Sequence, residues 1–151
     1  MLIGEFLIKK SLITNKELEI ALEEQKRTGD FLGMVLVRLR CLKEEDLLKA
    51  LSELFRIPFV SLKNEYIDWD LAMRFSASLV LEGHCLPFRE TALTITVAVL
   101  SPLNASGISQ IEEHGDQKKV NLVLVTTADM QEALKTYQLR IEAKIKKLLD
   151  G

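Results

Sequence analysis

The apolar positions in the first third of the chain follow a pattern that occurs twice, as an internal repeat. Residues 2–25 and 31–54 share the same glycine, aliphatic and alanine positions at an offset of 29 residues, and the spacer Lys26–Asp30 separates them. Repetition at such a period is typical of a supersecondary unit that buries its apolar face against a neighbouring copy. The sequence therefore predicts two units packed together, with a pseudo-symmetric groove between them.

Within each copy the pattern predicts a short helix, a corner and a second helix. Thr14–Glu17 has the form of a capping box at the start of the second helix, whereas Lys43 stands at the equivalent position of the second copy and loses the side-chain cap. Thr28–Asp30 is expected to be a turn. The acidic residues Glu17, Glu19, Glu23 and Glu24 are expected to face solvent. The inward stripes comprise Leu18, Ala21, Leu22, Leu47, Ala50, Leu51 and Leu54.

The pattern changes near residue 57, where short alternating runs predict strands. A long final helix is expected from Thr127, its cap, with an apolar stripe that continues through Ile145 and Leu148 and a basic tail that projects. Before this helix we expect a strand at Ile57–Leu62 and short helices within 68–82. A hairpin should follow, with strands at Cys85–Phe88 and Ala92–Leu100 joined through Arg89–Thr91. The remaining elements are expected to be a loop at Ser101–Asn104, a helix at about Ala105–Glu113, a turn at Gly115–Asp116 and a strand at Val120–Val125.

These elements predict an α+β fold. Residues 1–56 form an N-terminal four-helix unit of two tandem helical repeats, and residues 57–151 form a small α/β sandwich that ends in a long helix. We interpret the two as subdomains of one integrated domain.

Composition narrows the function classes. The chain has 151 residues, 48% of them hydrophobic, and a formal net charge of −2, which gives no electrostatic reason to expect nucleic acid as a partner. No apolar stretch is as long as a membrane span, so we expect no direct membrane insertion. The chain is expected to be cytoplasmic, with peripheral contact with the inner membrane only through another protein.

Candidate chemistry is sparse. The chain has no phosphate-binding loop and no dinucleotide, zinc-protease or nucleophile-elbow motif. His84 and His114 lack neighbours at metal-ligand spacing, and an adjacent His84–Cys85 pair in a strand would point to opposite faces. Cys41 and Cys85 are expected to be reduced, buried thiols. We therefore predict that the chain itself is not an enzyme, and has no catalytic residue, no metal site and no cofactor.

The paired units resemble the N-terminal, MshEN-type domain of type II secretion and type IV pilus assembly ATPases. The family motif reads Arg-Leu-Gly, two residues, two aliphatics, two residues, Gly, six residues, Leu, three residues, Leu, two residues, Gln. The first copy matches it with Leu2-Ile3-Gly4, Leu7-Ile8, Leu18, Leu22 and Gln25. The second copy matches with Phe31-Leu32-Gly33, Leu36-Val37, Leu47 and Leu51, and later segments such as Ile57–Leu62, Leu86–Phe88 and Leu93–Ala98 also look like the family.

The resemblance implies that the two copies together bind one molecule of cyclic di-GMP. The residues that it carries over are Ile3, Gly4, Leu7, Ile8, Leu18, Leu22, Gln25, Leu32, Gly33, Leu36, Val37, Leu47 and Leu51.

This sequence departs from the motif at its polar positions. Leu2 and Phe31 stand where the family has arginine, and Ser11 and Arg40 stand where it has its second glycine. Loss of two charge-assisted hydrogen bonds weakens binding by about 1.5–3 kcal/mol each. Other cations, namely Arg27, Arg38 and Arg40, are candidates to replace them.

Two functions therefore stay open. One is a non-catalytic regulatory and docking domain of a secretion or pilus ATPase, which binds a membrane-platform protein and couples to a C-terminal ATPase domain of the same chain. The alternative is a cyclic di-GMP sensor with a degenerate motif. A helix that ends in Lys146–Gly151 without a clear stop favours a chain that continues.

Overall fold

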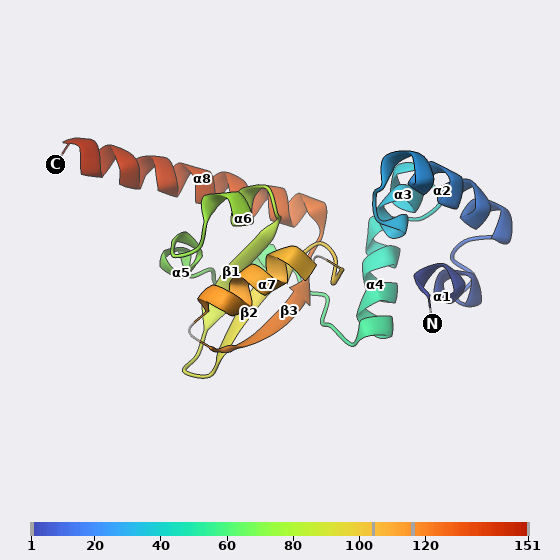
Figure 1. Ribbon diagram of the computed structural model, residues 1–151, viewed down its shortest axis with the longest axis horizontal. Coiled ribbons are helices and arrows are strands. Elements are labelled where there is room, and N and C mark those ends of the chain that lie inside the picture. The colour runs from blue at the N-terminus through green and yellow to red at the C-terminus, as the bar shows by residue number, and fades with distance from the viewer. Residues whose placement is uncertain (1, 104, 116, 151) are drawn as a thin grey trace. The chain divides into compact units, whose positions relative to one another are not determined.

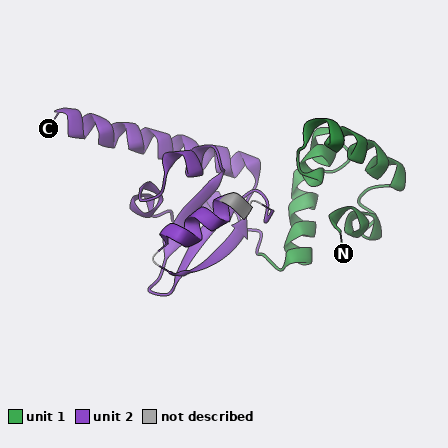
Figure 2. Cartoon of the chain, in the orientation of Figure 1, with its two compact units in different colours: residues 1–57 green, residues 58–151 purple. Residues whose placement is uncertain are grey.

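The protein forms two compact units, 1–57 and 58–151, with the boundary between Ile57 and Pro58 (Figures 1 and 2). The structure is a computed structural model, and it describes residues 2–103, 105–115 and 117–150. The turn residue Asp116 and the end of the loop at Asn104 lie outside the described residues. We describe each unit by itself.

Unit 1 consists of two helical hairpins, one for each sequence repeat. Helices α1 (Ile3–Lys9) and α2 (Asn15–Thr28) form the first, and α3 (Leu32–Arg38) and α4 (Glu44–Phe55) form the second. The capping box is present: Glu17 N donates to Thr14 Oγ1 at 3.1 Å, and Thr14 N donates to the Glu17 carboxylate at 2.9 Å. Lys43 gives α4 no side-chain cap, as expected. Only Gly29 and Asp30 of the predicted turn lie beyond the end of α2.

The repeats are equivalent in sequence but not in burial. Leu47 and Leu51 of α4 are buried, whereas the equivalent Leu18 of α2 is half-buried and Leu22 is 39% exposed. The prediction that Leu22 faces inward is therefore wrong. Glu17 and Glu24 of α2 are half-buried rather than fully solvated.

Unit 2 contains a three-stranded sheet in the order β1-β2-β3. Strands β1 (Cys85–Glu90) and β2 (Thr94–Val99) are antiparallel, and β3 (Lys119–Leu124) runs parallel to β2. The hairpin and the third strand are thus present, although the connecting turn falls at 91–93 because Arg89 and Glu90 continue β1. Pro87 is tolerated because β1 is an edge strand, and a bulge follows it.

The first strand predicted at Ile57–Leu62 is reduced to one bridge, between Phe59 and Leu124. Leu124 N donates to Pro58 O at 2.7 Å and Val60 N donates to Leu124 O at 2.9 Å. The chain then leaves the sheet for a short 3-10 helix, η1 (Leu62–Asn64). Proline at 58 and the early departure at 62 explain why the apolar run makes no ladder.

Helices cover the sheet of unit 2 (Figure 1). The short helices α5 (Trp69–Met73) and α6 (Ala77–Leu81) appear within 68–82 as predicted, and α7 (Ala105–His114) joins β2 to β3. The long α8 (Thr127–Asp150) completes the unit, with Thr126 rather than Thr127 as its cap: Asp129 N donates to Thr126 Oγ1 at 3.1 Å. These elements confirm the α+β class.

One core joins the sheet to α5, α6 and α8. It contains Phe88 of β1, Ala98 of β2, Val123 of β3, and Met130, Leu134 and Tyr137 of α8. The apolar stripe of α8 stays in contact with this core as far as Ile141, and from there on its side chains are exposed, Ile145 by 52% and Leu148 by 73%. The last two turns of α8 therefore make no contribution to the core.

Candidate functional site

The thirteen residues carried over from the family motif all lie in unit 1, and the structure divides them by depth. Only Leu22 is exposed. Gly4, Leu7, Leu36, Leu47 and Leu51 are buried and form part of the unit's own core. Ile3, Ile8, Leu18, Gln25, Leu32, Gly33 and Val37 are half-buried. A ligand on the repeats would thus contact the half-buried set and Leu22, while the buried set shapes the scaffold beneath.

The two motif glycines have a packing reason of their own. A Cβ added at Gly4 would lie 2.9 Å from Leu18 Cδ1, and one added at Gly33 would lie 2.8 Å from Leu47 Cδ1. Leu18 and Leu47 are themselves equivalent residues of the two copies. Each repeat is therefore held together by the same close contact of a glycine on the first helix with a leucine on the second.

The two positions of the second motif glycine have a backbone conformation that suits glycine. Ser11 has φ 60° and Arg40 has φ 62°, both in the left-handed region. Each residue ends its helix with the same pair of bonds: Ser11 N donates to Ile8 O and Leu12 N to Leu7 O, with equivalent bonds after α3. This is the Schellman arrangement, which glycine fits best. Both corners thus adopt a conformation that glycine favours, without a glycine at either position.

The two motif arginines are replaced by exposed apolar side chains. Leu2, which precedes α1, is 73% exposed, and Phe31, which precedes α3, is 45% exposed. Ile20 of α2 is a further exposed apolar residue, at 51%. The surface of unit 1 therefore offers apolar contact area at the positions where the motif would offer guanidinium groups.

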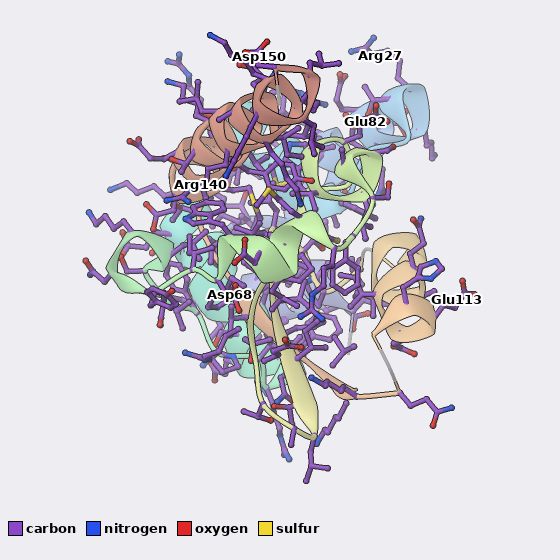
Figure 3. The ribbon with its side chains drawn as sticks, turned by 90° about the vertical axis from the view of Figure 1, so that its left-hand side faces the viewer. Arg27, Asp68, Glu82, Glu113, Arg140 and Asp150 are labelled. Atoms are coloured by element: carbon purple, nitrogen blue, oxygen red, sulfur yellow. The ribbon has the colours of Figure 1, made fainter. Side chains whose placement is uncertain are left out.

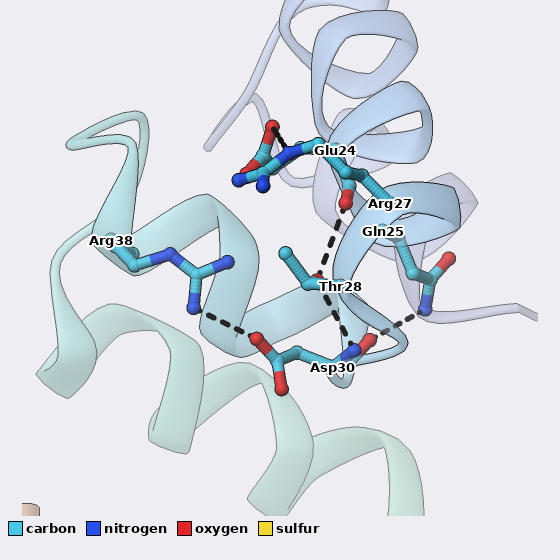
Figure 4. A network of polar contacts seen from close by, with 6 residues as sticks. All are labelled: Glu24, Gln25, Arg27, Thr28, Asp30 and Arg38. Atoms are coloured by element: carbon cyan, nitrogen blue, oxygen red, sulfur yellow. Dashed lines mark hydrogen bonds and ion pairs between the residues drawn. The ribbon is translucent and has the colours of Figure 1, made fainter.

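Arginines do lie near the spacer between the copies, in the polar network of Figure 4. Arg38 Nη1 is 2.9 Å from Asp30 Oδ2, and Arg27 pairs with Glu24. The Arg27 hydrogen bond, together with the charges of Arg27 and Arg38, holds the pKa of Glu24 below its ordinary value. Gln25 Nε2 donates to Asp30 O at 3.1 Å. Arg27 and Arg38 thus lie at one junction, each balanced by a carboxylate.

Arg40 points to a different place. It lines a surface hollow at the corner between α3 and α4, together with Val37, Lys43, Glu44 and Asp46. A second hollow, on α2, is lined by Leu22 and Gln25 among acidic and basic neighbours. Of the three arginines named as replacements, Arg27 and Arg38 therefore share a site and Arg40 does not.

Sequence reasoning missed the pairing of Glu24 and Asp30 with these arginines. Glu24 and Arg27 are three residues apart on one helix, a spacing at which opposite charges meet, so this pair could have been predicted from the sequence. Asp30 and Arg38 are eight residues apart and meet only because Gly29 turns the chain between α2 and α3.

Unit 2 does not assemble the histidine–cysteine pair. His84 is exposed and has φ 51°, so it precedes β1 instead of lying in a strand, and Cys85 is fully buried. Burial raises the pKa of the Cys85 thiol to about 11. Among the described residues no group of three or more His, Cys, Asp or Glu is placed to hold a metal ion. Within the same residues, no helix has the length and apolar character needed to cross a membrane.

The sequence is similar to a known domain family and to curated proteins. The model of the MshEN domain matches residues 55–143, a range that begins after both repeats. The type IV pilus assembly ATPase PilB of Myxococcus xanthus is 25% identical over 136 residues, 89% of this chain and 24% of the relative. PilB of Thermus thermophilus is 30% identical over 113 residues, 74% of this chain and 13% of the relative. The chain thus spans a quarter or less of the curated relatives that it matches.

Solved structures extend the similarity across both units. The structure of MshE with cyclic di-GMP has a TM-score of 0.80 at 21% identity and covers 91% of this chain and 99% of that chain. The N-terminal domain of XpsE has a TM-score of 0.70 at 16% identity, covering 88% of this chain and 91% of that one. At these identities the likeness concerns the fold.

Proposed function

Because the chain belongs to the MshEN domain family, we propose that it is a non-catalytic regulatory and docking domain of a type IV pilus assembly or type II secretion ATPase. The observation that carries this proposal is that similarity to PilB and to the XpsE N-terminal domain extends over most of the chain. The docking partner would be the cytoplasmic portion of a membrane-platform protein, and a motor domain in the same polypeptide would receive the signal.

The surface of unit 1 supports a docking role. Ile20 and Leu22 are exposed on α2, and Phe31 is exposed at the start of α3. Exposed apolar side chains favour a protein partner over water. The platform-facing surface would then include Leu22, whose equivalent in the second copy, Leu51, is buried.

Co-elution tests this proposal. The chain is mixed with each cytoplasmic fragment of the platform proteins from the same secretion or pilus system and run on a sizing column. We expect a complex with one fragment that still forms at high salt, because apolar contacts are not screened. Separate elution from every fragment would contradict a docking role.

A second candidate, cyclic di-GMP binding, is favoured by one specific observation. Both helix corners of the repeats have the left-handed conformation that suits the motif glycine, at Ser11 and Arg40, and the structure of MshE that resembles this chain contains cyclic di-GMP. Arg27 and Arg38 would have to exchange Glu24 and Asp30 for the ligand's phosphates, which charge-assisted hydrogen bonds allow.

Calorimetry with cyclic di-GMP tests the second candidate. Binding should be lost in the double variant Arg27→Gln, Arg38→Gln and retained in the control Arg89→Gln, which changes an exposed arginine of unit 2. The absence of both heat and a melting shift at millimolar ligand would remove this candidate and leave the docking proposal standing.

A further inference from the structure

Unit 2 carries a surface hollow that the family motif does not involve. Residues 65–70, which lead into α5, form its wall, and Arg140 of α8 closes one side. The segment is held firmly: Asp68 N donates to Phe88 O at 2.9 Å, and Asp68 Oδ1 accepts from Leu71 N at 3.1 Å. The wall is therefore fixed to the sheet by β1 and to α5 by its cap.

Two aromatic side chains line this hollow. Tyr66 is 84% exposed, which is unusual for a side chain that could bury its ring. Trp69 packs partly against the core of unit 2 and presents its ring to Arg140, whose guanidinium carbon lies 5.5 Å from the ring centroid. Figure 3 labels Arg140 on α8 and Asp68 at the start of α5. The hollow thus already holds one cation over an aromatic face.

The charged residues that line the hollow are mainly acidic, so the hollow favours a positively charged ligand. Glu65, Asp68 and Asp70 line it, and Arg140 is the one basic residue among the lining residues that the structure describes. Arg89 lies just outside, with Nη1 3.4 Å from Glu65 Oε2. Carboxylates beside aromatic faces suit a lysine or arginine side chain and repel a phosphate.

We propose that this hollow docks a basic side chain of a partner protein, with Tyr66 and Trp69 as its aromatic walls and Glu65 and Asp70 as its counter-charges. The proposal rests on the docking function proposed above, and it assigns that function a second contact surface, on unit 2, and a partner segment rich in lysine or arginine. Arg140 occupies the site within the chain and competes with the incoming cation.

The chain's single tryptophan makes the test direct, because Trp69 fluorescence reports on this hollow alone. The probe is a capped Gly-Arg-Gly-Lys-Gly-Arg peptide titrated into the whole chain. We expect a saturable change in fluorescence that weakens as salt is raised. Tyr66→Ala, or Glu65→Gln with Asp70→Asn, should reduce the affinity about fivefold. Arg140→Gln should increase the affinity, because it removes the competing cation.

The matched control is Glu113→Gln, an exposed carboxylate on α7 that lies away from Asp68 and Arg140 in Figure 3. It should bind the peptide like the wild type. Equal weakening by Glu113→Gln would mean non-specific attraction to an acidic protein and would overturn the proposal. So would the absence of a saturable change, or a response to cyclic di-GMP in place of the peptide. The titration needs no platform protein, so its failure is distinct from failure of the docking function.

Discussion

At the scale of single residues, the two corners of the repeats store a small strain. Ser11 and Arg40 occupy the left-handed region, which costs a residue with a Cβ about 1–2 kcal/mol relative to glycine. Glycine loses part of this advantage through its greater freedom in the unfolded chain. Ser11→Gly and Arg40→Gly should therefore each raise the free energy of unfolding by about 1 kcal/mol in urea denaturation.

The matched control for these corners is Gly29→Ala. Gly29 has φ 75° and nothing within 4 Å of an added Cβ, so only the backbone conformation is tested there. That change should lower the free energy of unfolding by about 1 kcal/mol. If all three substitutions shift stability in the same direction, backbone strain is not what the corners have in common.

Glu90 makes a pH-dependent contribution to unit 2. The hydrogen bond from Lys118, 2.7 Å away, and then the contact with Arg74 hold the pKa of Glu90 below its ordinary value of 4.5. Because the folded pKa is the lower one, the stabilisation is fully present above 4.5 and is lost as the pH falls through the folded value.

Glu90→Gln should therefore lower the free energy of unfolding by about 1 kcal/mol at neutral pH, and the difference from wild type should shrink towards pH 3. Denaturation series at pH 7, 5, 4 and 3 measure this. Glu113→Gln is the control without these two partners. A deficit for Glu90→Gln that stays constant from pH 7 to pH 3 would count against the ion-pair explanation.

At the scale of elements, the start of the second helix distinguishes the two copies. Thr14 and Glu17 form the capping box of α2, and Lys43 leaves α4 without a side-chain cap although Asp46 stands at the right spacing. Thr14→Ala should destabilise unit 1 by about 1 kcal/mol, and Lys43→Ser should stabilise it by a similar amount. Thermal unfolding followed by circular dichroism compares them; a stability loss in Lys43→Ser would show that the lysine has another role.

Elements with a strong local signal were predictable from the sequence. The repeat period, the capping box, the period-two run of β2 and the long stripe of α8 each depend on neighbours in sequence, so their helices and strands agree with the structure. The apolar run Ile57–Leu62 was misread because its pattern resembles a strand, while pairing depends on a partner far along the chain. The burial difference between Leu22 and Leu51 is likewise a property of assembly, which two identical patterns do not reveal.

The candidate site was predictable only as a scaffold. Gly4, Gly33 and the aliphatic ladder were found from the motif, and the structure gives each glycine a packing role. The directions in which Arg27, Arg38 and Arg40 point could not be predicted from the sequence, because they depend on the turn at Gly29 and the corner at Arg40. The aromatic hollow at Tyr66 and Trp69 was missed, because Arg140 closes it from a helix far along the chain.

At the scale of the whole molecule, the chain combines a preserved fold with altered surface chemistry. Family membership and the likeness to MshE and XpsE confirm the resemblance expected from the repeats. Apolar residues at Leu2 and Phe31 replace the motif's cations, and the cations that remain near the spacer are paired. This combination favours contact with a protein over contact with a nucleotide, and the exposed Leu22 of α2 is where we expect such contact to concentrate.

The affinity of the chain for the cytoplasmic platform fragment, measured by calorimetry for wild type and for Leu22→Asp, tests this account most directly. Leu22 is exposed, so the variant should fold, and burying the new carboxylate against the partner should weaken binding at least about tenfold. Leu93→Asp, at an exposed leucine in the turn between β1 and β2, is the matched control and should bind like wild type. Equal affinities for all three proteins would contradict docking through α2.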